Sequence, residues 1–308
     1  MTGWEASAAR LIRALLVGSG IVVAGVLGLR VLMLAVESRL TFLPVRGLEA
    51  TPAALGLPYE DLYPVTRDGV RLHGWFIPAD PAAARARQGG PLALLHFHGN
   101  AENIASLLPL AALTRAAGHH LFLVDYRGYG TSAGAPSENG LYIDGEAALA
   151  ALRARPDVGP DSIVPWGRSI GSTVAVRLAA DRAGVAGLIL ESPFTSARDL
   201  LREGGHPLLA ALSRFASYRF DQTEALRRIG VPVLVIHGTR DEVIPFRIGQ
   251  AVRDLVPGRA ELFPIDGGGH NDLLPLHGMQ LWDGARRFLD RLEPGTTVVT
   301  PPGRAPSD

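Results

Sequence analysis

The stretch GRSIG at residues 167–171 decides the fold of this chain. It follows an apolar, strand-like run at residues 162–166 and precedes a helical pattern that starts at residue 172. Glycines on both sides of Ser169 allow a tight strand-to-helix corner that pushes the hydroxyl group outward. The start of the helix directs free N–H groups at whatever the hydroxyl attacks. The pattern therefore predicts a nucleophilic serine.

A second stretch, GTSAG at residues 130–134, matches the same pattern. It lies several residues beyond a strand that is expected to end near Asp125, and Pro136 prevents a helix from starting there in register. Ser132 is therefore expected to be a loop residue, and Ser169 is the candidate nucleophile.

Composition narrows the class of protein. The 308 residues are 47% hydrophobic, which suffices for one catalytic domain with a buried α/β core. Thirty basic residues balance thirty acidic ones, so no net field favours nucleic acid as a partner. The chain has no cysteine, which excludes disulfides, thiolate metal sites and a cysteine nucleophile. Its nine histidines show no zinc-type spacing, so we expect no metal. We also expect no cofactor, and we infer no obligate protein partner.

The N-terminal region differs from the rest. Residues 14–36 are apolar apart from Arg30, and this run is long enough to cross a bilayer. No good signal-peptidase site follows, so we expect an uncleaved, single-pass membrane anchor at 14–36 after a flank at 1–13. A buried core helix is disfavoured because the run is apolar all round. Arginines flank both ends, so the side of the membrane is not assigned.

Strand-like and helical runs then alternate. After a connector at 37–58, this alternation over 59–292 predicts a doubly wound, mostly parallel sheet covered by helices on both faces. Strands are expected at 70–77, 92–97, 121–124, 163–166, 188–190, 231–236 and 260–264. Helices are expected at 104–117, 138–153, 172–183, 246–256 and 279–292, with a loop at 79–90. The stretch 293–308 is rich in proline, glycine and threonine and predicts a disordered tail.

The segment at about 192–229 is longer than one crossover helix requires. Its helix-like pieces at 197–203, 208–215 and 223–228 predict a small helical cap over the carboxyl ends of the strands, where open α/β sheets bind ligands. The apolar residues that could line this cap are Phe194, Leu208, Leu209 and Phe215. Each of them could equally pack on the sheet.

A serine hydroxyl needs a base, and a histidine base needs a carboxylate that fixes its tautomer. In this architecture the order is Ser, then Asp or Glu, then His, each on a loop after a late strand. Asp241 and His270 occupy these places, and the glycine run before His270 would let its loop approach the nucleophile. The competitors are Glu242 for the acid and His277 for the base.

The tetrahedral intermediate needs two N–H donors for its oxyanion. One is expected from the backbone of Ile170, and the other from the loop at 98–101, where we choose Asn100. Ala101 and Phe194 are the expected substrate contacts. His98 is expected to brace this loop, and His96 to be a strand residue whose ring contacts a backbone group.

Six strings carry a family resemblance: HFHGNAEN from His96, DYRGYGTSAGAPSE from Asp125, GRSIGS from Gly167, ESPFTS from Glu191, HGTRDEVIP from His237 and GGGHND from Gly267. Together they resemble the α/β-hydrolase superfamily, and in particular the type of the α/β-hydrolase domain-containing proteins 13 and 17 with their bacterial counterparts. The resemblance runs from about residue 37 to 292 and extends to a hydrophobic N-terminal anchor.

This resemblance implies the same site residues. Ser169 would be the nucleophile, Asp241 the acid and His270 the base, with oxyanion donors from Ile170 and the Asn100 loop. The cysteines of the animal depalmitoylating members are absent from this chain, which removes any case for self-palmitoylated anchoring.

The leading hypothesis is a membrane-anchored serine hydrolase that cleaves carboxylic esters or thioesters through an acyl-enzyme, with acyl-chain substrates plausible beside a bilayer. A serine peptidase or amidase on the same fold is the alternative, because it uses the same triad. A non-catalytic, membrane-anchored binding domain is a third hypothesis, against which the presence of Ser169, Asp241 and His270 argues.

Overall fold

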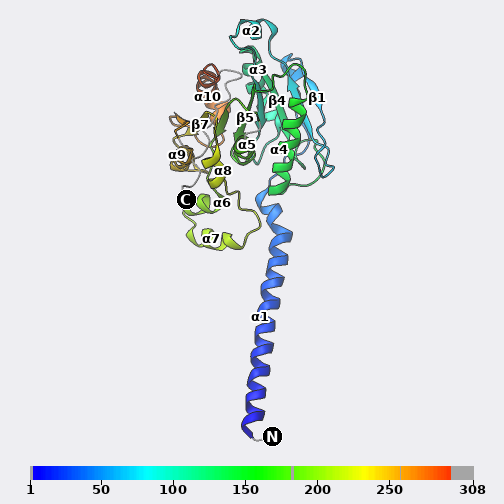
Figure 1. The fold of residues 1–308 in the computed structure, drawn as a ribbon, viewed down its shortest axis with the longest axis vertical. Coiled ribbons are helices and arrows are strands. Elements are labelled where there is room, and N and C mark those ends of the chain that lie inside the picture. The colour runs from blue at the N-terminus through cyan, green and yellow to red at the C-terminus, as the bar shows by residue number, and fades with distance from the viewer. Residues whose placement is uncertain (1–2, 182–183, 257, 293–308) are drawn as a thin grey trace, which may run out of the picture.

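The computed structural model describes residues 3–181, 184–256 and 258–292. A long helix, α1 (Gly3–Thr41), projects from a layered α/β domain and joins it at the end of the domain where α6 and α7 lie (Figure 1). Within the described residues, no helix combines the length and the apolar character that a membrane crossing requires. The membrane-spanning helix expected at 14–36 stays a prediction, and the tail expected at 293–308 lies outside the described residues.

The domain is built on one eight-stranded sheet with the order β1-β2-β4-β3-β5-β6-β7-β8. β2 pairs antiparallel with both β1 and β4, and every other neighbouring pair is parallel. The predicted mostly parallel sheet is confirmed. Its strands are β1 (Glu60–Leu62), β2 (His73–Ile77), β3 (Ala93–Phe97), β4 (His120–Asp125), β5 (Ile163–Arg168), β6 (Leu188–Glu191), β7 (Val233–Gly238) and β8 (Ala260–Ile265).

Helices cover both faces of this sheet. Leu95 and Phe97 of β3 bury against one face, while Leu94, directly before Leu95, buries against the other, because successive strand residues point to opposite sides. The first face is covered by α4 (Glu138–Arg153), α5 (Gly171–Ala180), α8 (Thr223–Arg228) and α9 (Phe246–Leu255). The second is covered by α3 (Leu108–Ala116) and α10 (Leu273–Leu289).

Several elements differ from the prediction. The loop expected at 79–90 contains a short helix, α2 (Pro81–Ala86), because Asp80 accepts hydrogen bonds from the first N–H groups and Pro81 occupies the first turn. The helix expected at 104–117 starts as a 3-10 turn, η2 (Ile104–Leu107). The last helix starts at Leu273 rather than 279, and His277 interrupts it with φ of −117°. β1 and a 3-10 turn, η1 (Pro52–Leu55), were not predicted, since both are short and mostly exposed.

The region from 192 to 229 contains α6 (Ala197–Glu203), α7 (Pro207–Leu212), η3 (Ser213–Phe215) and α8. α6 and α7 lie beside the domain end of α1 (Figure 1). The Glu37 carboxylate on α1 accepts hydrogen bonds from the backbone N–H groups of Ser217 and Tyr218 at 2.7 to 3.0 Å. Of the predicted lining residues, Leu208, Leu209 and Phe215 are exposed, whereas Phe194 is buried.

Candidate active site

Ser169 lies at the corner between β5 and α5, with φ of 52°. This is a strained conformation for a residue with a side chain, and it is typical of a nucleophile elbow. The two glycines of the motif make the corner possible. A Cβ atom on Gly167 would lie 2.4 Å from the Gly171 carbonyl oxygen, and one on Gly171 would lie 2.2 Å from the Phe97 carbonyl oxygen. Only glycine fits at either place without a backbone shift.

The structure brings Ser169, Asp241 and His270 together at the carboxyl ends of the strands. His270 Nε2 is 3.2 Å from Ser169 Oγ, and His270 Nδ1 is 2.8 Å from Asp241 Oδ2. An ionised Asp241 accepts a hydrogen bond from Nδ1–H, so the tautomer inferred from this contact leaves Nε2 as an acceptor that faces the serine hydroxyl. The arrangement can therefore take a proton from Ser169.

Asp241 is buried and well hydrogen-bonded. Its Oδ1 accepts from the backbone N–H groups of Val243 at 3.0 Å and Ile244 at 2.6 Å. Burial alone would raise the pKa of this carboxyl, but the neighbouring His237 and His270 rings and the Ile244 N–H hold the pKa well below its usual range. Asp241 is thus ionised at neutral pH and keeps the orientation of the His270 ring.

His237 is a site residue that the sequence reasoning missed. Its Nε2 lies 2.8 Å from the Ile244 carbonyl oxygen and 3.4 Å from Asp241 Oδ2, so the ring supports the Asp241 loop. Gly249 of α9 leaves room for this ring, since a Cβ atom there would lie 2.3 Å from His237 Nδ1. The sequence could have indicated this role, because His237 lies at the end of the strand that precedes Asp241.

The two competing residues lie elsewhere. Glu242 does not contact the His270 ring, but its Oε2 accepts from the His270 backbone N–H at 3.2 Å. His277 lies at the interruption of α10. Ser132 is in the loop after β4, where its hydroxyl donates to the Asp125 carbonyl oxygen at 2.8 Å and accepts from the His73 N–H at 2.8 Å.

The loop after β3 carries the expected second oxyanion donor. The Asn100 side chain is used structurally: Nδ2 donates to the Thr41 carbonyl oxygen at 2.7 Å, and Oδ1 accepts from the Tyr129 hydroxyl at 2.7 Å. The backbone N–H groups of Asn100 and Ile170 have no hydrogen-bond partner within the part of the chain that the structure describes. The donor role of Asn100 therefore concerns its backbone N–H and remains a prediction, as does that of Ile170.

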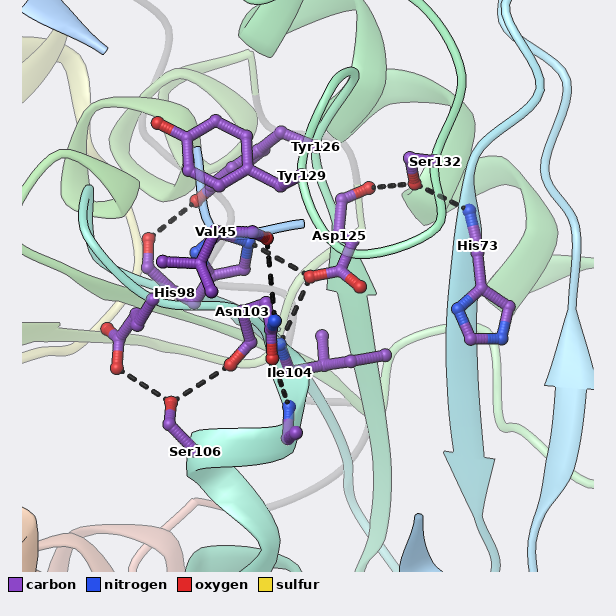
Figure 2. Close-up of polar contacts among 12 residues, drawn as sticks. Val45, His73, His98, Asn103, Ile104, Ser106, Asp125, Tyr126, Tyr129 and Ser132 are labelled. Carbon is purple, nitrogen blue, oxygen red and sulfur yellow. Dashed lines mark hydrogen bonds and ion pairs between the residues drawn. The ribbon is translucent and has the colours of Figure 1, made fainter. Parts of the chain in front are cut away.

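Figure 2 shows the contacts that hold the same loop in place. The buried His98 Nε2 lies 3.4 Å from Asp125 Oδ1, and Asp125 Oδ1 also accepts from the Ile104 N–H at 3.1 Å. Tyr126 donates its hydroxyl to the His98 carbonyl oxygen at 3.0 Å. His98 thus fixes the loop rather than facing Ser169, as its sequence context suggested.

The remaining predicted residues occupy different environments. Phe194 packs edge-on against Phe220 with ring centroids 6.4 Å apart, and Ala101 is exposed. Their roles as substrate contacts stay predictions. Among residues 3–181, 184–256 and 258–292, no three His, Asp or Glu side chains are grouped to hold a metal ion.

A family model and two relatives match this chain in sequence. Residues 92–225 match the family model "Serine aminopeptidase, S33". An uncharacterized protein of Mycobacterium tuberculosis is 34% identical over 255 residues, which cover 82% of this chain and 87% of the relative. The alpha/beta hydrolase domain-containing protein WAV2 of Arabidopsis thaliana is 32% identical over 296 residues, with coverage of 89% and 93%.

Solved structures share the fold. The Pyrococcus furiosus esterase Pf2001 superposes with a TM-score of 0.67 at 20% identity, covering 82% of this chain and 98% of its own. The Rhodococcus esterase RhEst1 superposes with a TM-score of 0.56 at 22% identity, covering 75% and 99%. At such low identity these similarities concern the fold and not the substrate.

Proposed function

This chain belongs to the α/β-hydrolase superfamily and is a hydrolase, and on that premise we propose that it cleaves carboxylic esters or thioesters with Ser169 as the nucleophile. The observation that carries the proposal is the continuous contact from Ser169 Oγ through the His270 ring to Asp241, at 3.2 and 2.8 Å. The esterase structural neighbours are consistent with this reaction class.

The proposed reaction has two halves. Ser169 Oγ attacks the substrate carbonyl carbon while its proton passes to His270 Nε2, and ionised Asp241 stabilises the imidazolium that forms. The backbone N–H groups of Ile170 and Asn100 donate to the oxyanion. The tetrahedral intermediate then collapses, and the leaving alcohol or thiol takes the proton from His270. Water attacks the acyl-enzyme by the same route and releases the acid, so the cycle requires no cofactor.

Peptide or amide hydrolysis is the second candidate, because the matched family model is described as a serine aminopeptidase. The triad chemistry is the same, and the two differ in how strongly the leaving group must be protonated. A panel of p-nitrophenyl esters of increasing acyl length, run against aminoacyl-nitroanilides, separates them. Higher kcat/KM on the nitroanilides would reject the ester proposal.

We also propose that α1 attaches the hydrolase domain to a lipid membrane, and that acyl-chain substrates are drawn from there. The support is the set of large apolar side chains that α1 exposes: Ile12, Leu15, Leu16, Val17, Ile21, Val22, Val23, Val26, Leu27 and Val31. Such a continuous apolar surface is unfavourable in water and marks a contact with lipid or protein.

Labelling with a fluorophosphonate tests the catalytic proposal. The wild-type protein should react at Ser169, and Ser169→Ala should not react. Ser169→Ala and His270→Ala should each lower kcat by up to about a millionfold, as in other triads, without unfolding the protein. The matched control is Ser132→Ala, which removes the serine of the second G-x-S-x-G stretch and should keep the labelling.

Failure of the folded wild-type protein to react, or equal reaction by Ser169→Ala, would overturn the enzyme mechanism. Failure to react would favour a non-catalytic binding domain, whereas equal reaction by Ser169→Ala would indicate a different nucleophile.

A further inference from the structure

Arg168 fills a position that the G-x-S-x-G pattern leaves open, yet its side chain is only 13% exposed. The guanidinium lies between two carboxylates: it pairs with Glu102, and its Nε is 3.2 Å from Glu191 Oε1. Its Nη2 donates to the His270 carbonyl oxygen at 2.9 Å and to Asn271 Oδ1 at 3.2 Å. One side chain thus contacts the loop after β3, the end of β6 and the loop that carries His270.

Glu102 extends these contacts toward the expected oxyanion donor. Its Oε1 accepts from the Gly99 backbone N–H at 2.5 Å, and its Oε2 accepts from the Ser106 hydroxyl at 2.8 Å. A Cβ atom on Gly99 would lie 2.7 Å from Glu102 Oε1 and 3.1 Å from Arg168 Nη1. Glycine at this position therefore lets the loop that carries Asn100 approach the ion pair.

Glu191 ties the same network to the nucleophile. Its backbone carbonyl oxygen accepts from the Ser169 N–H at 2.8 Å, while its buried side chain faces Arg168. Burial raises the pKa of Glu191. Burial would also raise the pKa of Glu102, but Arg168 and the hydrogen bonds to that carboxylate lower it to about 2. The Arg168–Glu102 pair is therefore ionic at neutral pH, and removing one partner would leave an unpaired buried charge.

We propose that Arg168 is a positioning residue that couples the His270 loop to the Asn100 loop and so holds the base and an oxyanion donor in place around Ser169. This inference rests on the proposed triad. The guanidinium suits the task because its planar fork reaches carboxylate and carbonyl acceptors in different directions, which an ammonium group cannot do. Displacements of about 1 Å in such groups can cost on the order of a hundredfold in rate.

The experiment compares Arg168→Ala with Arg155→Ala. Arg155 is a matched control, since its side chain is 15% exposed and pairs with the two carboxylates Glu60 and Asp157 outside the site. With a p-nitrophenyl ester, Arg168→Ala should lower kcat about 10- to 100-fold and change KM less than about twofold, because transition-state contacts are lost rather than ground-state binding. Arg155→Ala should keep the wild-type kcat even if its thermal unfolding temperature falls as much as that of Arg168→Ala.

Two further variants sharpen the test. Arg168→Lys should restore little of the lost kcat, because one ammonium group cannot replace all four contacts. Glu102→Gln should lower kcat in the same direction, and the Arg168→Ala/Glu102→Gln double variant should lose less than the product of the two single effects, since both act through one network.

Chemical rescue gives a readout that loss of stability alone would not produce. Arg168 and Glu102 border a cavity of about 250 Å³ whose other lining residues include Glu191 and Asn271. Millimolar guanidinium chloride should therefore restore part of the kcat of Arg168→Ala, and sodium chloride at the same concentration should not.

The inference is overturned if Arg168→Ala loses no more kcat than Arg155→Ala at equal stability, or if only KM changes. These outcomes are distinguishable from failure of the proposed function. If the proposed function fails, the wild-type protein does not react with the fluorophosphonate. If only the Arg168 inference fails, the wild-type protein reacts at Ser169, and the Arg168 variants keep wild-type kcat.

Discussion

His96 shows how burial acts on a single residue of this protein. Its side chain lies in β3, fully buried, with its ring 5.5 Å from that of Trp166. Neither ring nitrogen has a hydrogen-bond partner among the described residues, so the predicted contact of this ring with a backbone group is wrong. Burial disfavours the imidazolium form and lowers the pKa of His96 to about 3. His96 therefore remains neutral in the folded protein throughout the range in which it titrates in the unfolded chain.

This burial predicts a loss of stability in acid. The pKa of an unfolded histidine is about 6.5, so between about pH 6.5 and 3 the unfolded state binds more protons, and the free energy of unfolding falls as the pH falls. His96→Leu should reduce that slope by up to about 1.4 kcal/mol per pH unit. Urea unfolding at several pH values between 4 and 7 measures it.

Part of the pH dependence of the free energy of unfolding should remain in His96→Leu, because burial also lowers the pKa of His119 to about 3. The control is His206→Leu at an exposed position. An unchanged slope in His96→Leu would contradict the account of His96.

At the scale of elements, the β5–α5 corner controls the site. Gly171 begins α5 where the helix passes over the end of β3, so a side chain there would meet the Phe97 backbone. Backbone cannot move aside as a flexible side chain can, and a shift of β3 would displace the loop at 98–101 as well. The same close approach thus affects both the proposed nucleophile, Ser169, and the expected oxyanion donor.

Gly171→Ala should therefore destabilise the fold by roughly 1–3 kcal/mol and slow fluorophosphonate labelling of Ser169. Gly278→Ala is the matched control, since a Cβ atom there would approach nothing nearer than Leu274 Cδ1 at 3.6 Å. That control should leave labelling unchanged. Equal labelling rates in both variants would show that the corner tolerates a side chain.

The success of the sequence predictions also varied by element. The central strands β3, β5 and β7 were located to within about two residues at each end, since a strand buried on both faces is a continuous apolar run. β1 and α2 were missed because the first is short and mostly exposed, and the second depends on the Asp80 cap in a stretch that resembles a loop. The early start of α10 at Leu273 was missed because His277 breaks the helical pattern.

At the scale of the whole molecule, the domain end of α1 is fixed to the hydrolase domain through Glu37, and Phe42, directly after the helix, packs edge-on against Tyr218 with ring centroids 5.3 Å apart. The rest of the helix projects away from the domain (Figure 1), and its large apolar side chains that the structure describes between Ile12 and Val31 are exposed. Under the proposed membrane attachment, this separation would keep the lipid contact away from the loops that carry Ser169 and His270.

The full-length chain should therefore sediment with phosphatidylcholine vesicles. The Leu16→Lys/Val23→Lys double variant should sediment several-fold less, because each lysine adds a cost for contact with hydrocarbon. Leu276→Lys/Met279→Lys changes two equally exposed apolar residues on α10 and should bind like the wild type. Equal binding by all three proteins would refute attachment through α1.

Local patterns in the chain sufficed for the central strands and most of the covering helices, and for proposing Ser169, Asp241 and His270 as a triad, because turn glycines and apolar periodicity act over a few residues. The contacts of Arg168 were beyond such patterns, since they join residues 66 and 102 positions apart in the chain. The use of the Asn100 side chain to hold Thr41 is equally non-local, at 59 positions. Such partners are selected by packing of the sheet and its loops, which no short segment specifies.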